Sequence, residues 1–300
     1  MMVADNQVGI TASIRARFSD LRRLGHGGEG GTWLAKDASG RSVVLKPVPT
    51  ERRSTVARAF EVLRQVASPH LPAALELLGG AEGLWLVTAF VEGEPLAAGP
   101  VPLEQALGEA LGVAHALAAV HGLGTHHADV SANNVIVTPT RGVVLTDLGQ
   151  LGSLGCGTPG FLAPEVLRGG GGPPADVFAL GSLLCLRSFG QVPWRRPERL
   201  LELAGLPREQ ARAGVRARLA ALAEAADVEL PRALASLLER LLDPDPRARS
   251  IDARQIVARL RQLQRVCTSG ALLRAHAAWW LPNRWRFLAD ASMHAQVEAG

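Results

Sequence analysis

The chain has 300 residues, of which 47% are hydrophobic and 20% are charged, and its net charge is +4. This composition is sufficient for one large domain or two lobes with a buried core. The small net charge, with arginines interleaved with Glu and Leu over residues 195–218, argues against nucleic acid as a partner. No apolar run reaches the ~18 residues of a membrane span, and residues 1–17 lack the basic-then-apolar order of a signal peptide, so we expect a cytoplasmic protein with no transmembrane span. Three widely separated cysteines argue against a disulfide framework.

The first third of the chain alternates short apolar runs with glycine turns, which predicts strands. Residues 1–17 show no strong pattern and are expected to form an extension or a short packing segment. Apolar residues at helical spacing predict one helix at 54–66. Strands are expected at 21–25, 32–36, 42–46, 75–78 and 84–88, and together they would form a five-stranded sheet.

Two features of these strands point to a phosphate group. The glycine-rich turn 25–31 lies between two strands, where backbone amides can approach phosphate oxygens without obstruction by side chains. A Rossmann-type site would need a helix directly after this turn. Lys46 lies inside an apolar strand of a chain whose only other lysine is Lys36, next to a turn. A chain that otherwise uses arginine but keeps this lysine indicates a need for a compact ammonium group there.

Helical patterns dominate after residue 93. Apolar residues at helical spacing predict a helix over 103–121, and an almost wholly apolar stretch predicts a buried helix over 176–189. Further helices are expected at 197–204, 209–224, 231–242 and 251–266, and two short strands at 135–137 and 143–145.

A polar loop separates the long helix from the two short strands. Asp129 and Asn134 lie five residues apart in or beside this loop, and Asp147 ends the second strand, so the three side chains can converge on one metal and phosphate centre. Their carboxylate and amide oxygens suit Mg²⁺. A transition-metal site built from the adjacent His126 and His127 with Asp129 is disfavoured, because the sequence places no further ligand.

With these pieces in order, residues 18–266 resemble the protein kinase superfamily and look most like the bacterial Ser/Thr type, with a local likeness of the catalytic loop to RIO-type kinases. The resemblance implies an α+β, bilobal protein kinase-like fold. Residues 18–92 would form a small N-lobe with a five-stranded antiparallel sheet and one helix, and 93–266 a larger, mainly helical C-lobe. Residues 1–17 would be an N-terminal extension and 267–300 a C-terminal tail.

The resemblance also implies an ATP site. Lys46 matches the strand lysine that holds the α- and β-phosphates, and Glu61, nine residues before His70, matches its ion-pair partner. The glycine-rich loop is matched by Gly25, Gly27 and Gly30. Thr88 stands at the gatekeeper position. Adenine contacts are implied for backbone groups near Ala89 and Val91, and Leu24, Val44, Thr88 and Ile136 are also expected to bind the nucleotide.

Phosphoryl transfer is implied for the loop around Asp129. By resemblance, Asp129 would accept the proton of the substrate hydroxyl, and Asn134 and Asp147 would bind Mg²⁺. The segment 157–165 matches the end of a kinase activation segment, which resembles a platform for docking a substrate peptide.

Four further residues match structural positions of the family. Asp176 and Gly181 fit the buried helix that braces the catalytic loop. Arg249 fits the arginine that pairs with Glu165 at the end of the activation segment.

Three positions depart from the family pattern. Ala128 replaces an arginine that reads a phosphate on the activation segment, and Thr32 replaces an aliphatic residue that caps adenine. Ser131, counted here among the catalytic residues, replaces a lysine that neutralises the γ-phosphate, which removes transition-state stabilisation and would slow turnover. RIO-type kinases, however, carry a serine at that place. The missing arginine suggests activity without phosphorylation of the activation segment, whose only acceptors are Ser153 and Thr158.

The sequence therefore predicts a Ser/Thr protein kinase that uses ATP and Mg²⁺ to phosphorylate a protein substrate. The alternative is a pseudokinase that binds nucleotide or a protein partner with little or no transfer. A small-molecule phosphotransferase of similar fold is disfavoured, because 157–165 resembles a peptide-docking platform. The tail, 267–300, contains tryptophans beside arginines and is expected either to pack on its own domain or to dock on a partner or a membrane surface.

Overall fold

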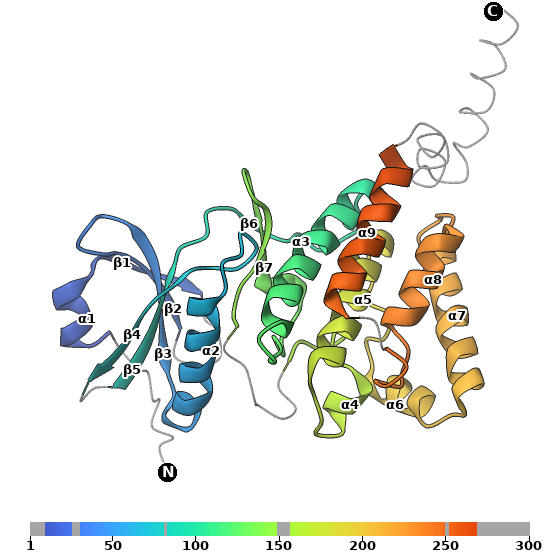
Figure 1. The fold of residues 1–300 in the computed structure, drawn as a ribbon, viewed down its shortest axis with the longest axis horizontal. Helices are drawn as coiled ribbons and strands as arrows, with labels where there is room; N and C mark the ends of the chain where they lie inside the picture. The colour runs from blue at the N-terminus through green and yellow to red at the C-terminus, as the bar shows by residue number, and fades with distance from the viewer. Residues whose placement is uncertain (1–9, 26–30, 81–82, 149–156, 250–251, 269–300) are drawn as a thin grey trace, which may run out of the picture.

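The computed structural model consists of a lobe built on an antiparallel sheet, followed along the chain by a mainly helical lobe (Figure 1). It describes residues 10–25, 31–80, 83–148, 157–249 and 252–268. The sheet has five strands in the order β1-β2-β3-β5-β4. These strands are β1 (Ser19–Gly25), β2 (Thr32–Lys36), β3 (Ser42–Val48), β4 (Ala74–Gly80) and β5 (Gly83–Ala89). The predicted sheet and the α+β, bilobal fold are confirmed.

Strand β3 gives the sheet two different faces, because alternate side chains of a strand point in opposite directions. Val43 and Leu45 are buried on one face. Val44 and Lys46 therefore point to the opposite face, on which helix α2 (Arg53–Gln65) packs. The apolar cluster between α2 and the sheet contains Val48, Val56, Phe60 and Leu86. The lysine singled out by the sequence thus lies on the side of the sheet that faces α2.

A short helix that the sequence did not predict packs on the first face of the sheet. Helix α1 (Ala12–Arg17) begins after Thr11, whose side chain accepts a hydrogen bond from Ile14 N at 3.4 Å. Ile14 is 2% exposed and belongs to the cluster that contains Leu45 and Trp85. This helix is therefore a packing segment of the N-lobe rather than a detached extension.

Two helices form the centre of the C-lobe. Helix α3 (Leu103–His121) contacts α5 (Pro173–Phe189), which is buried along nearly its whole length. Helix α9 (Ala253–Thr268) packs along α3 (Figure 1). The remaining helices are α4 (Pro164–Leu167), α6 (Pro197–Ala204), α7 (Arg208–Ala225) and α8 (Arg232–Leu241), and 3-10 turns lie at Thr50–Arg52 and Ala132–Asn134. Every predicted helix is present, with its ends within three residues of the expected positions.

A three-stranded sheet carries the polar loop between the lobes. Its strands are β6 (Glu94–Pro95), β7 (Val135–Thr138) and β8 (Gly142–Leu145). Strand β6 and helix α4 were not predicted, because elements of two and four residues are too short to show periodicity.

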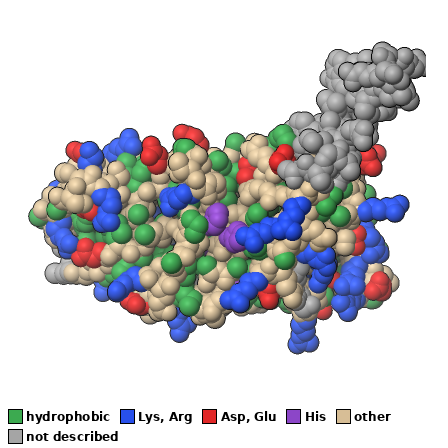
Figure 2. Space-filling model, turned by 45° about the horizontal axis from the view of Figure 1, so that its top comes forward, with side chains coloured by type: hydrophobic (Ala, Val, Ile, Leu, Met, Phe, Trp, Pro, Cys, Tyr) green, Lys and Arg blue, Asp and Glu red, His purple; other side chains and the backbone are tan. Residues whose placement is uncertain are grey.

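The surface carries charges of both signs. Acidic and basic side chains are intermingled over the sheet lobe on the face drawn in Figure 2. Within the described ranges, no helix has both the length and the apolar character that crossing a membrane requires.

Replacing Ile14 by alanine tests whether α1 belongs to the folded N-lobe. We expect Ile14→Ala to lower the free energy of unfolding by about 2–5 kcal/mol, because the change removes buried methyl groups and leaves a cavity. Urea unfolding measures this loss. The control is Leu123→Ala, at a side chain that is 41% exposed, which should change stability by about 0.5 kcal/mol or less. Equal losses in the two variants would contradict the packing role of α1.

Candidate active site

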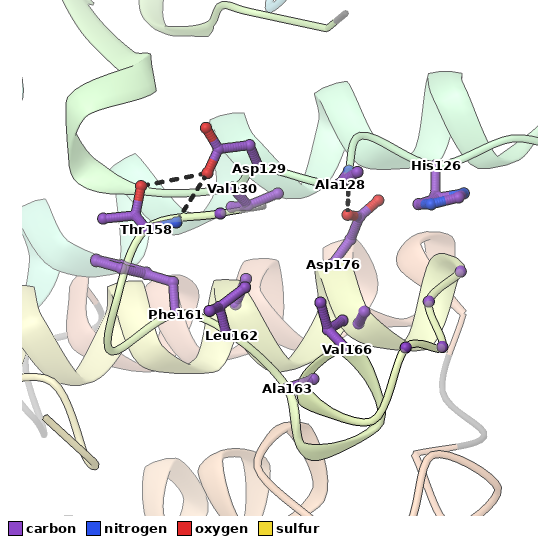
Figure 3. Close-up of a pocket in the computed structure, with 17 residues that line it drawn as sticks. His126, Ala128, Asp129, Val130, Thr158, Phe161, Leu162, Ala163, Val166 and Asp176 are labelled. Atoms are coloured by element: carbon purple, nitrogen blue, oxygen red, sulfur yellow. Dashed lines mark hydrogen bonds between the residues drawn. The ribbon is translucent and has the colours of Figure 1, made fainter. Parts of the chain in front are cut away.

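A buried carboxylate holds the polar loop between α3 and β7. Asp176 of α5 is 1% exposed and accepts a hydrogen bond from His127 N at 2.7 Å. It accepts a second from Ala128 N at 2.9 Å, which is drawn in Figure 3. His121 Nε2 lies 2.8 Å from the same carboxylate. Burial alone would raise the pKa of Asp176, but the hydrogen bond and charge of His121, together with His127, lower it. The predicted bracing of the loop by Asp176 is confirmed.

The hydrogen bonds from the His127 and Ala128 amides to Asp176, together called the clamp, hold Ala128 in an unfavourable backbone conformation. Ala128 has φ 71°, in the left-handed region, which costs about 1–2 kcal/mol for a residue with a Cβ atom. The two hydrogen bonds from the His127 and Ala128 amides to Asp176 offset that cost and set the direction in which the chain enters Asp129.

His127 is fully buried beneath the loop and links it to β8. Its Nδ1 accepts a hydrogen bond from Asp129 N at 3.3 Å, so Nε2 carries the proton and donates to Thr146 O at 2.9 Å. Burial lowers the pKa of His127, and the neighbouring carboxylates of Asp176, Asp129 and Asp147 only partly oppose that effect. The ring is therefore neutral near pH 7 and acts as a structural support.

Asp129 is held from two directions. Asn134 Nδ2 donates to both Asp129 O and Asp129 Oδ2, at 2.8 Å each. Thr158 N and Thr158 Oγ1 donate to Asp129 Oδ1, at 3.2 Å each (Figure 3). The carboxylate is therefore fixed between the polar loop and the segment 157–165. Since these bonds use the amide nitrogen of Asn134, its carbonyl oxygen is the polar atom left to bind a cation.

Asp147 links the polar loop to the N-lobe. Thr146 donates from both its N–H and its hydroxyl to Asn134 O, at 2.7 and 3.1 Å, which sets the next residue beside Asn134. The side chain of Asp147, at φ 66°, forms an ion pair with Lys46 Nζ of β3. Residues predicted from three separate stretches of sequence, Lys46, Asn134 and Asp147, are therefore brought together at one place between the lobes.

A cavity of about 490 Å³ extends from this ion pair. The predicted nucleotide and metal residues that line it are Leu24, Val44, Lys46, Thr88, Ala89, Val91, Ile136 and Asp147. Val44 lies opposite Thr88 in the β3–β5 pairing, so the strand register sets two of these walls. Thr32 also lines the cavity and pairs with Gly25 at the end of β1. Gly27, Gly30, Gly149, Ser153 and the tail beyond residue 268 lie outside the described residues.

A second cavity, of about 320 Å³, lies beside Asp129 (Figure 3). Its walls include Ala128 and Asp129 of the loop, Phe161 and Leu162, and the glycine run 169–172. This cavity was not predicted from the sequence. Two features of the sequence indicate it: the small side chain of Ala128 and the glycine run 169–172, both of which leave space.

The predicted pair between Glu165 and Arg249 is present. The guanidinium group of Arg249 is buried, contacts the carboxylate of Glu165 and lies over the ring of Phe178, 5.2 Å from its centroid. This contact ties the end of the segment 157–165 to the centre of the C-lobe.

Residues 18–259 match the family model described as a protein kinase domain. The chain belongs to the protein kinase family. It is 30% identical to the serine/threonine-protein kinase AfsK of Streptomyces griseus over 289 residues, which is 88% of this chain and 34% of that protein. It is 33% identical to the serine/threonine-protein kinase PknA of Mycobacterium tuberculosis over 220 residues, which is 64% of this chain and 49% of that protein. The kinase domain thus spans a third to a half of the length of these relatives.

The fold of a solved structure agrees with this assignment. Rad53 residues 1–466, in complex with AMP-PNP, has a TM-score of 0.65 and 20% identity, over 81% of this chain and 65% of that chain. At this identity the likeness establishes the kinase fold.

The kinase domain lacks the predicted pair between Lys46 and Glu61. The side chain of Glu61 is 60% exposed and lies 4.0 Å from Arg64, one turn further along α2. The buried side of α2 instead carries Val56 and Ala59. Glu61 is two residues beyond Ala59, which is about 200° around the helix axis. The assignment of Glu61 as the partner of Lys46 was wrong, because it placed the helix in the wrong rotational phase.

Ser131 does not take the position of a catalytic group either. Its side chain is 0% exposed and lines neither of the two cavities described above. Its hydroxyl has no hydrogen-bond partner in the part of the chain that the structure describes. As placed, Ser131 is a small buried residue beneath the loop.

The Glu165–Arg249 contact should be a major source of stability. We expect Glu165→Ala to lower the free energy of unfolding by about 3–5 kcal/mol, because a buried guanidinium then loses its carboxylate. Urea unfolding measures the loss. The matched control is Glu202→Ala, which breaks a pair with Arg199 whose side chains are 66% and 72% exposed, and which should cost about 1 kcal/mol or less. Similar losses in both variants would contradict this expectation.

Burial of neutral His127 should make stability depend on pH. The pKa of His127 is lower in the folded chain than the ordinary histidine value of 6.5, so the unfolded chain takes up this proton first as the pH falls. The contribution is therefore fully present above about pH 6.5 and is lost below it. Urea midpoints between pH 8 and pH 5.5 should fall, and His127→Gln should show a smaller fall over that range than the parent chain. An equal fall in both would be evidence against this linkage.

Proposed function

We propose that this kinase domain transfers the γ-phosphate of ATP to Ser or Thr residues of a protein substrate and uses Mg²⁺ to do so. The observation that carries the proposal is the cavity between the lobes, which ends at the Lys46–Asp147 pair, with Asn134 beside Asp147 and the Asp129 carboxylate bound to Asn134. The printed names of AfsK and PknA as serine/threonine-protein kinases support the choice of acceptor. The reaction would take place in the cytoplasm.

Adenine fits the apolar half of the cavity. Val44 of β3, Val91 beyond β5 and Ile136 of β7 offer apolar surface to a flat ring, and Thr88 and Ala89 lie at the end of β5. A pocket with apolar walls and few polar groups is typical of a nucleotide base site. With the base in this half, the phosphates would extend toward Lys46, whose ammonium group carries the opposite charge.

The donor set beside Lys46 fits Mg²⁺. Asp147 offers carboxylate oxygens and Asn134 its amide carbonyl oxygen, and Mg²⁺ is commonly held by one or two such oxygens together with phosphates and waters. Bound there, Mg²⁺ would neutralise charge on the β- and γ-phosphates. Lys46 pairs with Asp147, so the lysine and the metal ligand keep each other in place.

Asp129 would act on the substrate. Its carboxylate would accept the proton of the Ser or Thr hydroxyl while the hydroxyl oxygen bonds to the γ-phosphorus and the bond between that phosphorus and the ADP oxygen breaks. Asn134 and Thr158 hold the carboxylate in one orientation through their hydrogen bonds. Much of the contribution of the chain would then be positioning of the reacting groups.

An assay with labelled ATP tests the proposal. We expect label to pass to a generic basic protein in the presence of Mg²⁺, and Asp129→Asn to reduce the rate about 10²- to 10⁴-fold because the general base is lost. Asp147→Asn should also lose transfer, and the control Asp252→Asn, at an exposed helix start, should retain it. Label on the chain itself would have to lie on Ser or Thr, because the chain has no tyrosine.

Two results would overturn the proposal. Nucleotide binding without transfer to any acceptor would leave the chain a pseudokinase. Transfer that persists in Asp147→Asn at the parent rate would mean that the phosphate comes from a different site.

A further inference from the structure

The described lining of the cavity near α2 includes a cation, Arg52, and no carboxylate of this helix. Arg52, Val56 and Leu63 all line the cavity, at intervals of four and seven residues, and Ala59 completes the same helical stripe. The acidic residue of this helix, Glu61, is exposed on another side. The stripe therefore presents Arg52 as its charged group.

The charges around the cavity are unevenly distributed. Among the described lining residues, Lys46 and Arg52 are basic and Asp147 is acidic. Lys46 contacts Asp147 at the end of the cavity. Ser131, at the place where related kinases carry a lysine, is uncharged and buried. The triphosphate of ATP carries several negative charges, and Arg52 is the other lining group of opposite sign.

The local structure holds Arg52 in position. It ends the 3-10 turn Thr50–Arg52, its N–H donates to Pro49 O at 3.0 Å, and α2 begins directly after it. Two prolines, Pro47 and Pro49, restrict the backbone that leads to this turn. Arg52 is half-buried and its Nε is shielded from solvent, so its attraction to an anion is less weakened by water than that of a surface arginine.

We propose that Arg52 is a second phosphate-binding cation of the nucleotide site and takes over charge neutralisation that Ser131 does not provide. A guanidinium group donates two parallel hydrogen bonds to a pair of phosphate oxygens, which suits it to this role. The inference rests on the proposed function, because it assumes that the cavity holds ATP. The inference predicts that the contribution of Arg52 to binding affinity increases with the number of phosphates on the ligand.

Binding measurements by calorimetry test this dependence without requiring catalysis. The ligands are adenosine, ADP and a non-hydrolysable ATP analogue, each with Mg²⁺. We expect Arg52→Gln to weaken the triphosphate analogue about tenfold or more and ADP by less, because charged hydrogen bonds are lost, while adenosine binding stays within about twofold. Arg52→Lys should recover part of the loss. The matched control is Arg53→Gln, at the adjacent exposed arginine, which should bind all three ligands as the parent chain does.

The outcomes separate this inference from the proposed function. Equal weakening of adenosine and the triphosphate analogue by Arg52→Gln would mean that Arg52 supports the fold of the cavity, and would overturn the inference. Unchanged binding of the triphosphate analogue by this variant would also overturn it, while nucleotide binding by the parent chain would stand. A parent chain that binds none of the three ligands would overturn the proposed function and the inference together.

Discussion

The hydrogen bonds from the catalytic loop to the buried carboxylate of Asp176 are the contacts on which the site depends. A single side chain of α5 fixes two consecutive backbone amides, and through them the direction in which the chain reaches Asp129. Because the lowered pKa of Asp176 keeps the carboxylate ionised, the clamp acts as a strong, charge-assisted acceptor. The neutral ring of His127 accepts a hydrogen bond from Asp129 N and donates one to Thr146 O, so it connects the loop to the residue that precedes Asp147.

The N-lobe supplies its part of the site through the alternation of one strand. In β3, Val43 and Leu45 bury themselves against the side that α1 covers, so Val44 and Lys46 must point into the cavity. The core of the lobe and the cavity therefore use opposite faces of β3 through alternate residues of the strand. A one-residue slip of this strand would exchange the two faces and remove Lys46 from the site.

The departures from the family pattern concern charge. The chain has no carboxylate of α2 beside Lys46, no long side chain at Ala128 and no cation at Ser131. Lys46 instead pairs with Asp147, and Arg52 enters the cavity from the start of α2. The small side chain of Ala128 leaves space, which contributes to the second cavity beside Asp129. The arrangement of the loop itself is retained, because the clamp on Asp176 uses backbone amides rather than the side chain at 128.

The sequence by itself determined most of the strands and helices and predicted that Asp129, Asn134 and Asp147 lie close together. The periodicity of apolar residues predicts whether a segment is a helix or a strand. The spacing of a motif within one loop predicts which residues lie close together, because the chain between them is short. The tertiary structure decided the rest. Periodicity does not say which side of α2 meets Lys46, and a rotation of about 200° separates Ala59 from Glu61. Packing against the sheet set that rotation, and packing also buried Ser131 and brought Arg52 into the cavity, since each depends on contacts between segments far apart in the chain.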